Sequence, residues 1–260
     1  SSSFELRGRH ISSNRYVPMI LPDGRSLHGI NDASIRIGLR LSKDETIVRM
    51  PFEVRHMGSK YPIFSFDFTG AKRGVLPASY DYLRLEGRMQ YRLNLPPIGY
   101  SQLMLEGGKI FGKVPYLLLK LHEGNGTYFY DRYAFSCMNF YEFSSDAWIS
   151  FFYEHHFNGF LLGRVPLLKK LNWREVFVFK GVYGTLSARN DGSLPNTKAV
   201  MLFPVGMSSV EHPYLETGFG IENIFRLLRV DCIWRLTHHR AIPGLSIPTF
   251  TVNFSLNLKF

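Results

Sequence analysis

The sequence lacks any apolar run of about 20 residues, the length that a helix needs to span a bilayer. Hydrophobic residues make up 45% of the 260 positions, yet the mean hydropathy is only -0.08. Apolar residues are therefore spread along the chain, and a helical membrane protein is excluded. The aromatic fraction is 15%, which suits aromatic girdles at a membrane interface.

Motifs that carry chemistry are also scarce. The two cysteines, Cys137 and Cys232, match no metal or redox spacing, and we expect two packed thiols rather than a disulfide. His155 and His156 are neighbours, so on a strand they point to opposite faces and cannot share a metal ion without a bulge. No glycine-rich segment has the strand and helix that flank a phosphate-binding loop. We therefore expect no enzyme activity, no cofactor and no metal site.

Acidic residues are the scarcer charge, with 21 Asp and Glu against 31 Lys and Arg, and the net charge is +10. A basic excess can indicate a nucleic-acid partner. Here the basic residues are dispersed along the chain, and the short cluster Lys169-Lys170 is flanked by Leu and Pro. We expect these charges to line a polar interior or to contact anionic lipid head groups, and we expect no nucleic-acid partner.

A strict alternation of apolar and polar residues is what the chain does have. Between Pro248 and Phe260 every second residue is apolar: Phe250, Val252, Phe254, Leu256, Leu258 and Phe260. Successive side chains of a strand point to opposite faces, so this segment predicts a strand with one apolar and one polar side. Its length suits a transmembrane strand, which needs about 9–11 tilted residues.

The same alternation recurs from Leu83 to Leu95, where Leu, Met and Tyr alternate with charged or amide side chains. At about 180° per residue these charges form one stripe, whereas the 100° step of a helix would scatter them. A polar interior and a lipid-facing exterior are typical of a transmembrane β-barrel. A soluble β-sandwich with one wet face would give the same alternation.

We predict an all-β fold, an antiparallel transmembrane β-barrel, with residues 1–260 as the C-terminal part of one barrel domain. The start at Ser1 shows no signal peptide, so we expect a fragment whose upstream strands are absent. Short turns at Pro96-Pro97 and Asn223 to Arg226 are placed on the periplasmic side, and the long connections outside. Roughly ten strand-like runs occur, at about 34–41, 47–55, 61–69, 80–95, 98–111, 147–158, 173–185, 214–223, 226–238 and 248–260.

Charged side chains on the polar faces of these strands form the best candidate site. In a barrel they would line the lumen, where cross-strand pairs contribute roughly 0.2–1 kcal/mol each and favour a structural role over solute selectivity. The predicted lumenal residues are Arg84, Glu86, Arg88, Arg92, Glu154, His156, Glu216, Glu222, Arg229, Asp231 and Arg235.

Several long blocks carry a family resemblance, among them GGKIFGKVPYLLL, HEGNGTYFYDRYAFSCMNFYEFSSDAW and ETGFGIENIFRLLRVDCIWRL. They resemble the C-terminal barrel region of Bacteroidota outer-membrane proteins of unknown function that carry an N-terminal carboxypeptidase-like regulatory domain, which is absent here. That barrel is in turn similar to the surface-antigen superfamily of outer-membrane assembly barrels, which have sixteen strands. The resemblance therefore implies an outer-membrane location and further strands.

The resemblance also implies partners and a role: outer-membrane lipid and lipopolysaccharide, the outer-membrane assembly machinery and other envelope proteins, in envelope biogenesis or in transport and translocation. The connection at about 113–146 would fold back into the lumen. Asp131, Arg132 and Tyr133 then fall near the Arg-Gly-aromatic motif of the assembly barrels, although the glycine is missing here. The ending Phe254, Leu256, Leu258 and Phe260 would be the signal that the assembly machinery reads.

Two other functions remain open on the sequence. A structural or accessory subunit would have a plugged barrel and long loops that bind partner proteins. A soluble lipocalin-like carrier would need polar residues on the outside of the strand from Leu83 to Leu95 and an apolar interior.

Overall fold

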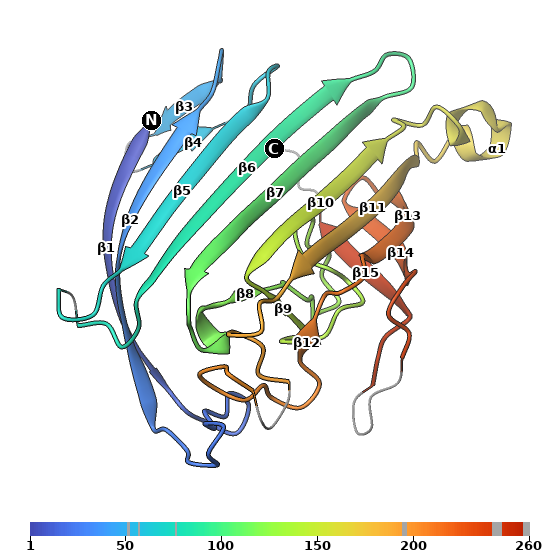
Figure 1. Cartoon of the computed structure of the whole chain (residues 1–260). Helices are drawn as coiled ribbons and strands as arrows, with labels where there is room; N and C mark the ends of the chain where they lie inside the picture. Colours follow the sequence, from blue (N-terminus) through green and yellow to red (C-terminus); the bar gives the residue numbers. More distant parts are fainter. Residues whose placement is uncertain (51–52, 57, 76, 194–196, 241–245, 257–260) are drawn as a thin grey trace.

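A long, curled antiparallel sheet dominates the computed structural model, which describes residues 1–50, 53–56, 58–75, 77–193, 197–240 and 246–256 (Figure 1). This sheet has ten strands in the order β1-β2-β5-β6-β7-β10-β11-β13-β14-β15. Its strands are β1 (Ser2–Ser12), β2 (Gly29–Leu41), β5 (Ile63–Ala71), β6 (Tyr82–Asn94), β7 (Tyr100–Gly112), β10 (Ala147–His156), β11 (Arg174–Thr185), β13 (Tyr214–Ile224), β14 (Leu228–Arg235) and β15 (Phe250–Leu256).

Smaller elements lie in the connections between these strands. A three-stranded sheet contains β8 (Lys120–Leu121), β9 (Phe143–Ser145) and β12 (Ser208–Ser209), and a separate hairpin contains β3 (Ile47–Met50) and β4 (Glu53–His56). The helices are the 3-10 turns η1 (Tyr116–Leu118) and η2 (Leu162–Arg164) and the short helix α1 (Pro166–Lys169). Across the described ranges, no helix has the length and apolar character needed to cross a membrane.

The strands agree with the predicted runs at most places, with two corrections. The run at 47–55 is not a strand of the large sheet, because β3 and β4 pair with each other, with Ile47 opposite His56. The first strand, β1, was not predicted, and it pairs along its whole length with β2. The all-β prediction is therefore confirmed. Among the residues that the structure describes, the sheet does not close, since β1 and β15 stand at the two ends of the strand order.

One face of the sheet, here called the outer face, is apolar and exposed. Residues directly opposite each other in the ladders share a face, so Ile37, Phe68 and Leu85 belong to one row. Large exposed side chains of the outer face include Phe4, Leu6, Ile37, Leu39, Leu41, Phe64, Phe66, Phe68, Leu83, Leu93, Phe111, Ile149, Tyr183, Phe219, Trp234, Phe250 and Leu256. This arrangement is the opposite of a lipocalin-like carrier, whose outside would be polar.

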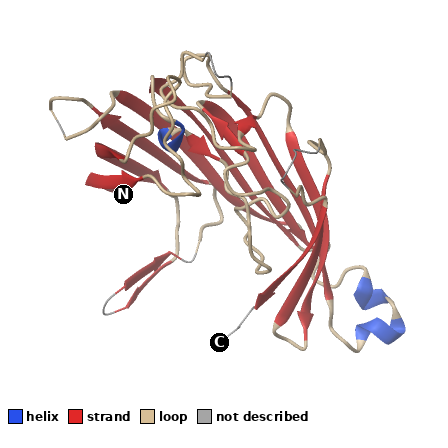
Figure 2. Ribbon diagram, turned by 90° about the horizontal axis from the view of Figure 1, so that it is seen from below, coloured by secondary structure: helices blue, strands red, loops and turns tan. Residues whose placement is uncertain are grey.

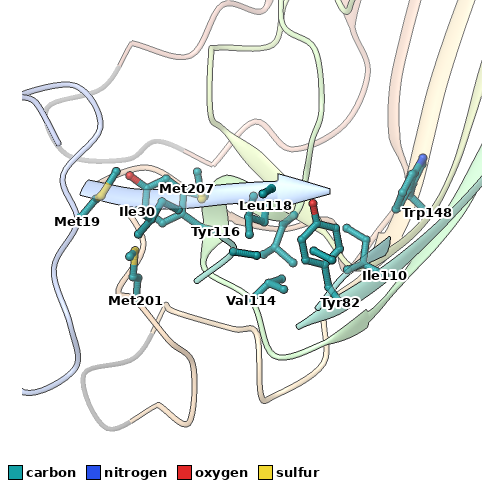
Figure 3. Close-up of a cluster of buried hydrophobic side chains, with 14 residues drawn as sticks. Met19, Ile30, Tyr82, Ile110, Val114, Tyr116, Leu118, Trp148, Met201 and Met207 are labelled. Carbon is teal, nitrogen blue, oxygen red and sulfur yellow. The ribbon is translucent and has the colours of Figure 1, made fainter. Parts of the chain in front are cut away.

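Loops cover part of the inner face (Figure 2), whereas β1 is exposed along almost its whole length. One hydrophobic core lies at the end of the sheet where β2 and β6 begin and β7 ends, around Ile30, Tyr82 and Ile110 (Figure 3). The connecting segments that contain Met19, Tyr116 and Met201 pack against these strand ends. A second core joins the loop between β7 and β10 to the sheet, and contains Met104, Phe135, Met138, Phe143, Phe152, Val182, Val210 and Tyr214. The hydrophobic packing of the chain is thus on the inner face.

The connections alternate between the two ends of the sheet because consecutive strands of the large sheet run antiparallel. The tight β6–β7 turn, segment 157–173 with α1, and the β13–β14 turn lie at one end. The long connections 113–146 and 186–213 lie at the other end, where most loops gather (Figure 1). The predicted difference between short and long connections is therefore present from β6 onward, whereas the long connection 42–62 with β3 and β4 lies at the end with the short turns.

Candidate functional site: the charged inner face

The predicted lumenal residues all lie on inner-face positions of β6, β10, β13 and β14. Ladder pairing places Arg92 and Glu154 in one row through Gln102, and Glu216 and Arg235 directly opposite each other. Many of these groups are almost fully buried, with Glu154 at 1% and Glu216 and Asp231 at 0% exposure. Buried charges need partners, so the contacts of each one determine what the site can do.

Glu154 is the centre of a first cluster. Its carboxylate accepts hydrogen bonds from Arg132 Nε at 2.7 Å and from Arg229 Nη2 at 3.2 Å. The Tyr130 hydroxyl also donates to Glu154, and the Arg229 guanidinium lies 4.4 Å from the centre of the Tyr130 ring. Burial raises the pKa of the Tyr130 phenol well above its usual value, so this group stays a donor. Arg229 also contacts Asp231, with Nε 2.8 Å from Oδ2.

His156 extends this cluster to β13, on the far side of β11. Its Nε2 lies 3.4 Å from Glu154 Oε2, and its Nδ1 lies 3.2 Å from Glu222 Oε2. The imidazole stacks on the Tyr100 ring with the centroids 4.5 Å apart. Glu154 and His156 share a face, while His155 contacts Ser101 on the other side. His156 therefore links two carboxylates.

Glu216 is the centre of a second cluster, which binds the loop between β7 and β10 through backbone N–H groups of the loop rather than through loop side chains. Its carboxylate accepts hydrogen bonds from the backbone N–H groups of Ser136 at 2.8 Å and Cys137 at 2.7 Å, and from the Tyr214 hydroxyl at 2.7 Å. Burial raises the pKa of the Cys137 thiol to about 12, so the thiol stays protonated. Both cysteines are free, as expected.

Two further cations fix the same loop. Lys180 Nζ donates to the backbone carbonyls of Asp131 at 2.8 Å and Ala134 at 2.6 Å. Arg235 pairs with Glu142 of the loop, with Nη2 2.6 Å from Oε1. Carboxylates and cations of four strands thus clamp the segment from Tyr130 to Glu142 against the inner face.

The charges of β6 lie apart from this clamp. Arg84 pairs with Glu86 at 2.8 Å, and Arg92 lies 4.0 Å from the centre of the Tyr100 ring. Arg88 contacts Glu106 at 2.6 Å, and Glu106 also accepts from Lys120 at 2.7 Å. The structure therefore divides the predicted network into the clamp and the β6 pairs, with the Tyr100 ring as a contact between them, since both Arg92 and His156 lie against it.

The predicted loop residues make different contacts from one another. Arg132 reaches Glu154, and Asp131 turns its side chain back to its own loop, where Oδ1 accepts from Tyr133 N at 2.8 Å. The Tyr133 ring packs edge-on against Phe152, with the centroids 6.2 Å apart. Together they place the middle of connection 113–146 on the inner face.

Small residues of β13 make room for these charges. A Cβ added at Gly220 would lie 2.2 Å from Asp231 Oδ1, and one at Gly218 would lie 2.7 Å from the Cys232 carbonyl oxygen. The two glycines alternate with larger outer-face residues, as Gly and Phe do in GFG. The sequence therefore leaves inner-face space where the Arg229–Asp231 pair lies.

Sequence reasoning missed several members of the clamp and of the β6 pairs. Lys180 and Glu106 lie on inner-face positions, and the alternation of β11 and β7 could have identified both. Tyr130 and Glu142 come from an irregular loop, which has no periodicity to mark them. Their contacts become visible only when residues far apart in sequence are brought together.

The last described strand also contacts the loop. Tyr130 N donates to Phe254 O at 2.7 Å, and Phe254 N donates to Tyr128 O at 2.7 Å, so this segment pairs with the free edge of β15. Leu256 is exposed on the outer face. Leu258 and Phe260, the remaining residues of the predicted assembly signal, lie outside the described residues.

Chemically, the clamp positions a loop. Within the part of the chain that the structure describes, no group of three or more His, Cys, Asp or Glu side chains is arranged to hold a metal ion. The strongest acceptors, Glu154 and Glu216, are already bound by donors of the loop. The arrangement supports occlusion of the inner face.

Comparison with known proteins gives a family and a fold. The profile described as "Family of unknown function (DUF5686) C-terminal domain" matches residues 2–188. Among solved structures, the chain is similar to a crystal structure of BamA from Haemophilus ducreyi lacking POTRA domains 1-3, with a TM-score of 0.51 at 11% identity. That similarity covers 92% of this chain and 45% of the BamA chain, and it concerns the fold alone. No curated protein matches.

The family match extends from β1 through the clamped loop and β11, and therefore over more than half of the chain. The chain thus belongs to the family of unknown function DUF5686, with its C-terminal domain.

Proposed function

We propose that this chain is part of an outer-membrane β-barrel protein that acts in envelope biogenesis or in transport. The observation that carries the proposal is the outer face, where large side chains such as Phe4, Phe219 and Phe66 are 67%, 60% and 39% exposed. Such an extended apolar surface is unfavourable in water and favourable in lipid. The fold similarity to the BamA barrel supports the same location.

The barrel would close through strands that complete the open sheet. Unpaired backbone N–H and C=O groups at a sheet edge cost several kcal/mol each in hydrocarbon, so β1 needs a partner there, as does the part of β15 that the loop at Tyr128 to Tyr130 does not pair with. In this proposal the short connections face the periplasm, and an N-terminal carboxypeptidase-like regulatory domain precedes the barrel in the full protein. The charged inner face would be the lumen.

A second role, that of an accessory subunit with a plugged barrel, is favoured by the clamp. Glu154, Glu216, Lys180 and Arg235 each bind the segment from Tyr130 to Glu142. A loop held in this way would block passage of solutes through the lumen. Transport would then require a partner or a gradient that moves the loop.

Membrane location is tested by expressing the full protein and fractionating the cells. We expect it in the outer membrane, resistant to urea extraction, and migrating differently on a gel with and without heating. Recovery in the soluble periplasmic fraction as a folded protein would contradict the proposal.

Lumen occupancy is tested by conductance of the purified protein in planar bilayers. A plugged barrel gives no steady conductance, whereas the Glu154→Ala, Glu216→Ala double variant should show channel events as the loop detaches. Large steady conductance of the unaltered protein would refute the accessory role and favour transport.

A further inference from the structure

We propose that the cleft between segment 158–174 and the β13–β14 turn binds the head group of an anionic glycerophospholipid. This proposal rests on the membrane location proposed above and adds a ligand to it. The cleft has a volume of about 840 Å³ and is lined by Lys169, Lys170, Arg174 and Arg226, with Asn172 and Asn223 beside them. It will be called the Lys169 cleft.

The Lys169 cleft carries an excess of positive charge: Arg174 lies opposite Glu222 in the β11–β13 ladder and interacts with it electrostatically, whereas Lys169, Lys170 and Arg226 lie outside the strands. In the described part of the chain, none of its four cations has a carboxylate oxygen within 4.0 Å. The two nearest acidic residues along the chain have other partners: Glu175 accepts from Leu162 N, and Glu222 contacts His156. No Asp or Glu lines the cleft. An anion would therefore meet an excess of cations together with amide donors.

Exposed apolar side chains surround these cations. Leu167 is 77% exposed, Phe225 87%, and Leu161, Val165, Leu171 and Leu227 between 44% and 50%. Clusters of this kind rarely face water in monomeric proteins. Basic residues beside exposed Leu and Phe are typical of segments that lie in the membrane interface, with the apolar groups among the acyl chains.

The depth of the cleft agrees with this chemistry. On the outer face, Phe177 and Phe219 pack against each other with their ring centroids 5.2 Å apart and their planes tilted by 53°, and aromatic residues of this kind are enriched near the membrane boundary. Arg174 is three residues along β11 from Phe177, which corresponds to about 10 Å at about 3.3 Å per residue. Arg174 shares the inner-face row of Glu222, so the cations at the level proposed for lipid phosphates are Lys169, Lys170 and Arg226, which lie in the connections past the ends of β11 and β13. Their position at the end with short connections selects a phospholipid of the periplasmic leaflet rather than lipopolysaccharide.

The test uses Trp173, which lies in the cleft, and Trp234, which lies on the outer face at the other end of the sheet. Two variants of the full protein are made: Trp234→Phe, which keeps Trp173, and Trp173→Phe, which keeps Trp234. Each variant is placed in phosphatidylcholine vesicles with a minor fraction of phosphatidylglycerol. Either the phosphatidylcholine or the phosphatidylglycerol carries brominated acyl chains, which quench the fluorescence of a nearby tryptophan. Trp148 remains in both variants because it is buried on the inner face. We expect quenching of Trp173 to be stronger when the anionic lipid carries the bromine.

Variants that remove positive charge test whether the anionic preference comes from the Lys169 cleft. Replacement of Lys169 and Lys170 by Gln should weaken the preference for phosphatidylglycerol about thirtyfold, since each cation near a membrane surface contributes about 1 kcal/mol. The matched control, Lys72→Gln with Arg73→Gln, removes the same charge from the opposite end of the sheet and should leave the preference unchanged.

The outcomes separate this inference from the membrane proposal. If either lipid quenches Trp234 but Trp173 shows no preference for the anionic lipid, the lipid site in the Lys169 cleft is refuted and the membrane location is kept. No quenching of either tryptophan would refute both. An equal loss in the Lys72 control, or stronger binding of lipid A phosphates than of phosphatidylglycerol, would also overturn the assignment.

Discussion

Replacement of Glu216 by Ala should release the clamped loop, and Cys137 provides a reporter of that release. The Cys137 side chain is 0% exposed, and its backbone N–H is one of the two loop donors that Glu216 accepts. In the native protein the thiol can react only when the loop opens. The experiment uses a Cys232→Ser background, which leaves one thiol in the chain.

The expected magnitude follows from the lost hydrogen bonds. Hydrogen bonds to a charged group contribute about 1.5–3 kcal/mol each, and Glu216 accepts two from the loop, at 2.8 Å and 2.7 Å. The lower limit, about 3 kcal/mol for the opening free energy, corresponds to a labelling rate on the order of a hundredfold faster. The measurement is the rate of maleimide modification in detergent micelles, followed by mass spectrometry.

The matched control is Glu86→Ala. Glu86 lies on the same inner face, and its partner is Arg84 rather than the loop. Its replacement should leave the labelling rate of Cys137 unchanged. If Glu216→Ala and Glu86→Ala had the same effect, or if Cys137 already reacted at the rate of an unfolded chain, the loop would not be held by Glu216.

Three further predictions address facing, packing and assembly. Arg at outer-face Met89 should lower the free energy of unfolding in lipid by about 2–4 kcal/mol, whereas Gln90→Arg on the inner face should be mild in the same urea titration; equal effects would contradict the facing. Gly220→Ala should destabilise by about 1–3 kcal/mol in urea, because its Cβ would lie 2.2 Å from Asp231 Oδ1. Deletion of Phe254 to Phe260 from the full protein should leave it protease-sensitive in the periplasm, and normal abundance in the outer membrane would refute that assembly role.

The alternation of the sequence was sufficient to predict the strands with a strong apolar face. Leu83 to Leu95 and β6 agree closely, because the period of two is determined by backbone geometry alone. The first strand carries only Phe4 and Leu6 as large outer-face residues, and Gly8 and His10 dilute the pattern. Its pairing with β2 is a tertiary contact, which a local pattern does not reveal.

The candidate site shows the same division between local and long-range information. Alternation identifies Glu154, Glu216 and Arg235 as inner-face residues, because each occupies a known position in a strand. It does not identify their partners, since Tyr130 and Glu142 lie in an irregular loop. Arg235 and Glu142 are separated by 93 positions, and only the path of the loop brings them together.

The buried ion pairs of the clamp make large movements of the loop costly, and this cost distinguishes a transport role from that of a plugged accessory barrel. Removal of one partner from a buried ion pair costs about 3–5 kcal/mol, and a typical folded domain is stable by about 5–15 kcal/mol. Complete withdrawal of the loop would separate Glu154 from Arg132 and Arg235 from Glu142 and would expose the Glu216 carboxylate. Such a movement would cost an amount comparable with the stability of the whole fold. A transport role therefore needs a ligand or partner that replaces these contacts one by one, whereas a plugged accessory barrel needs none.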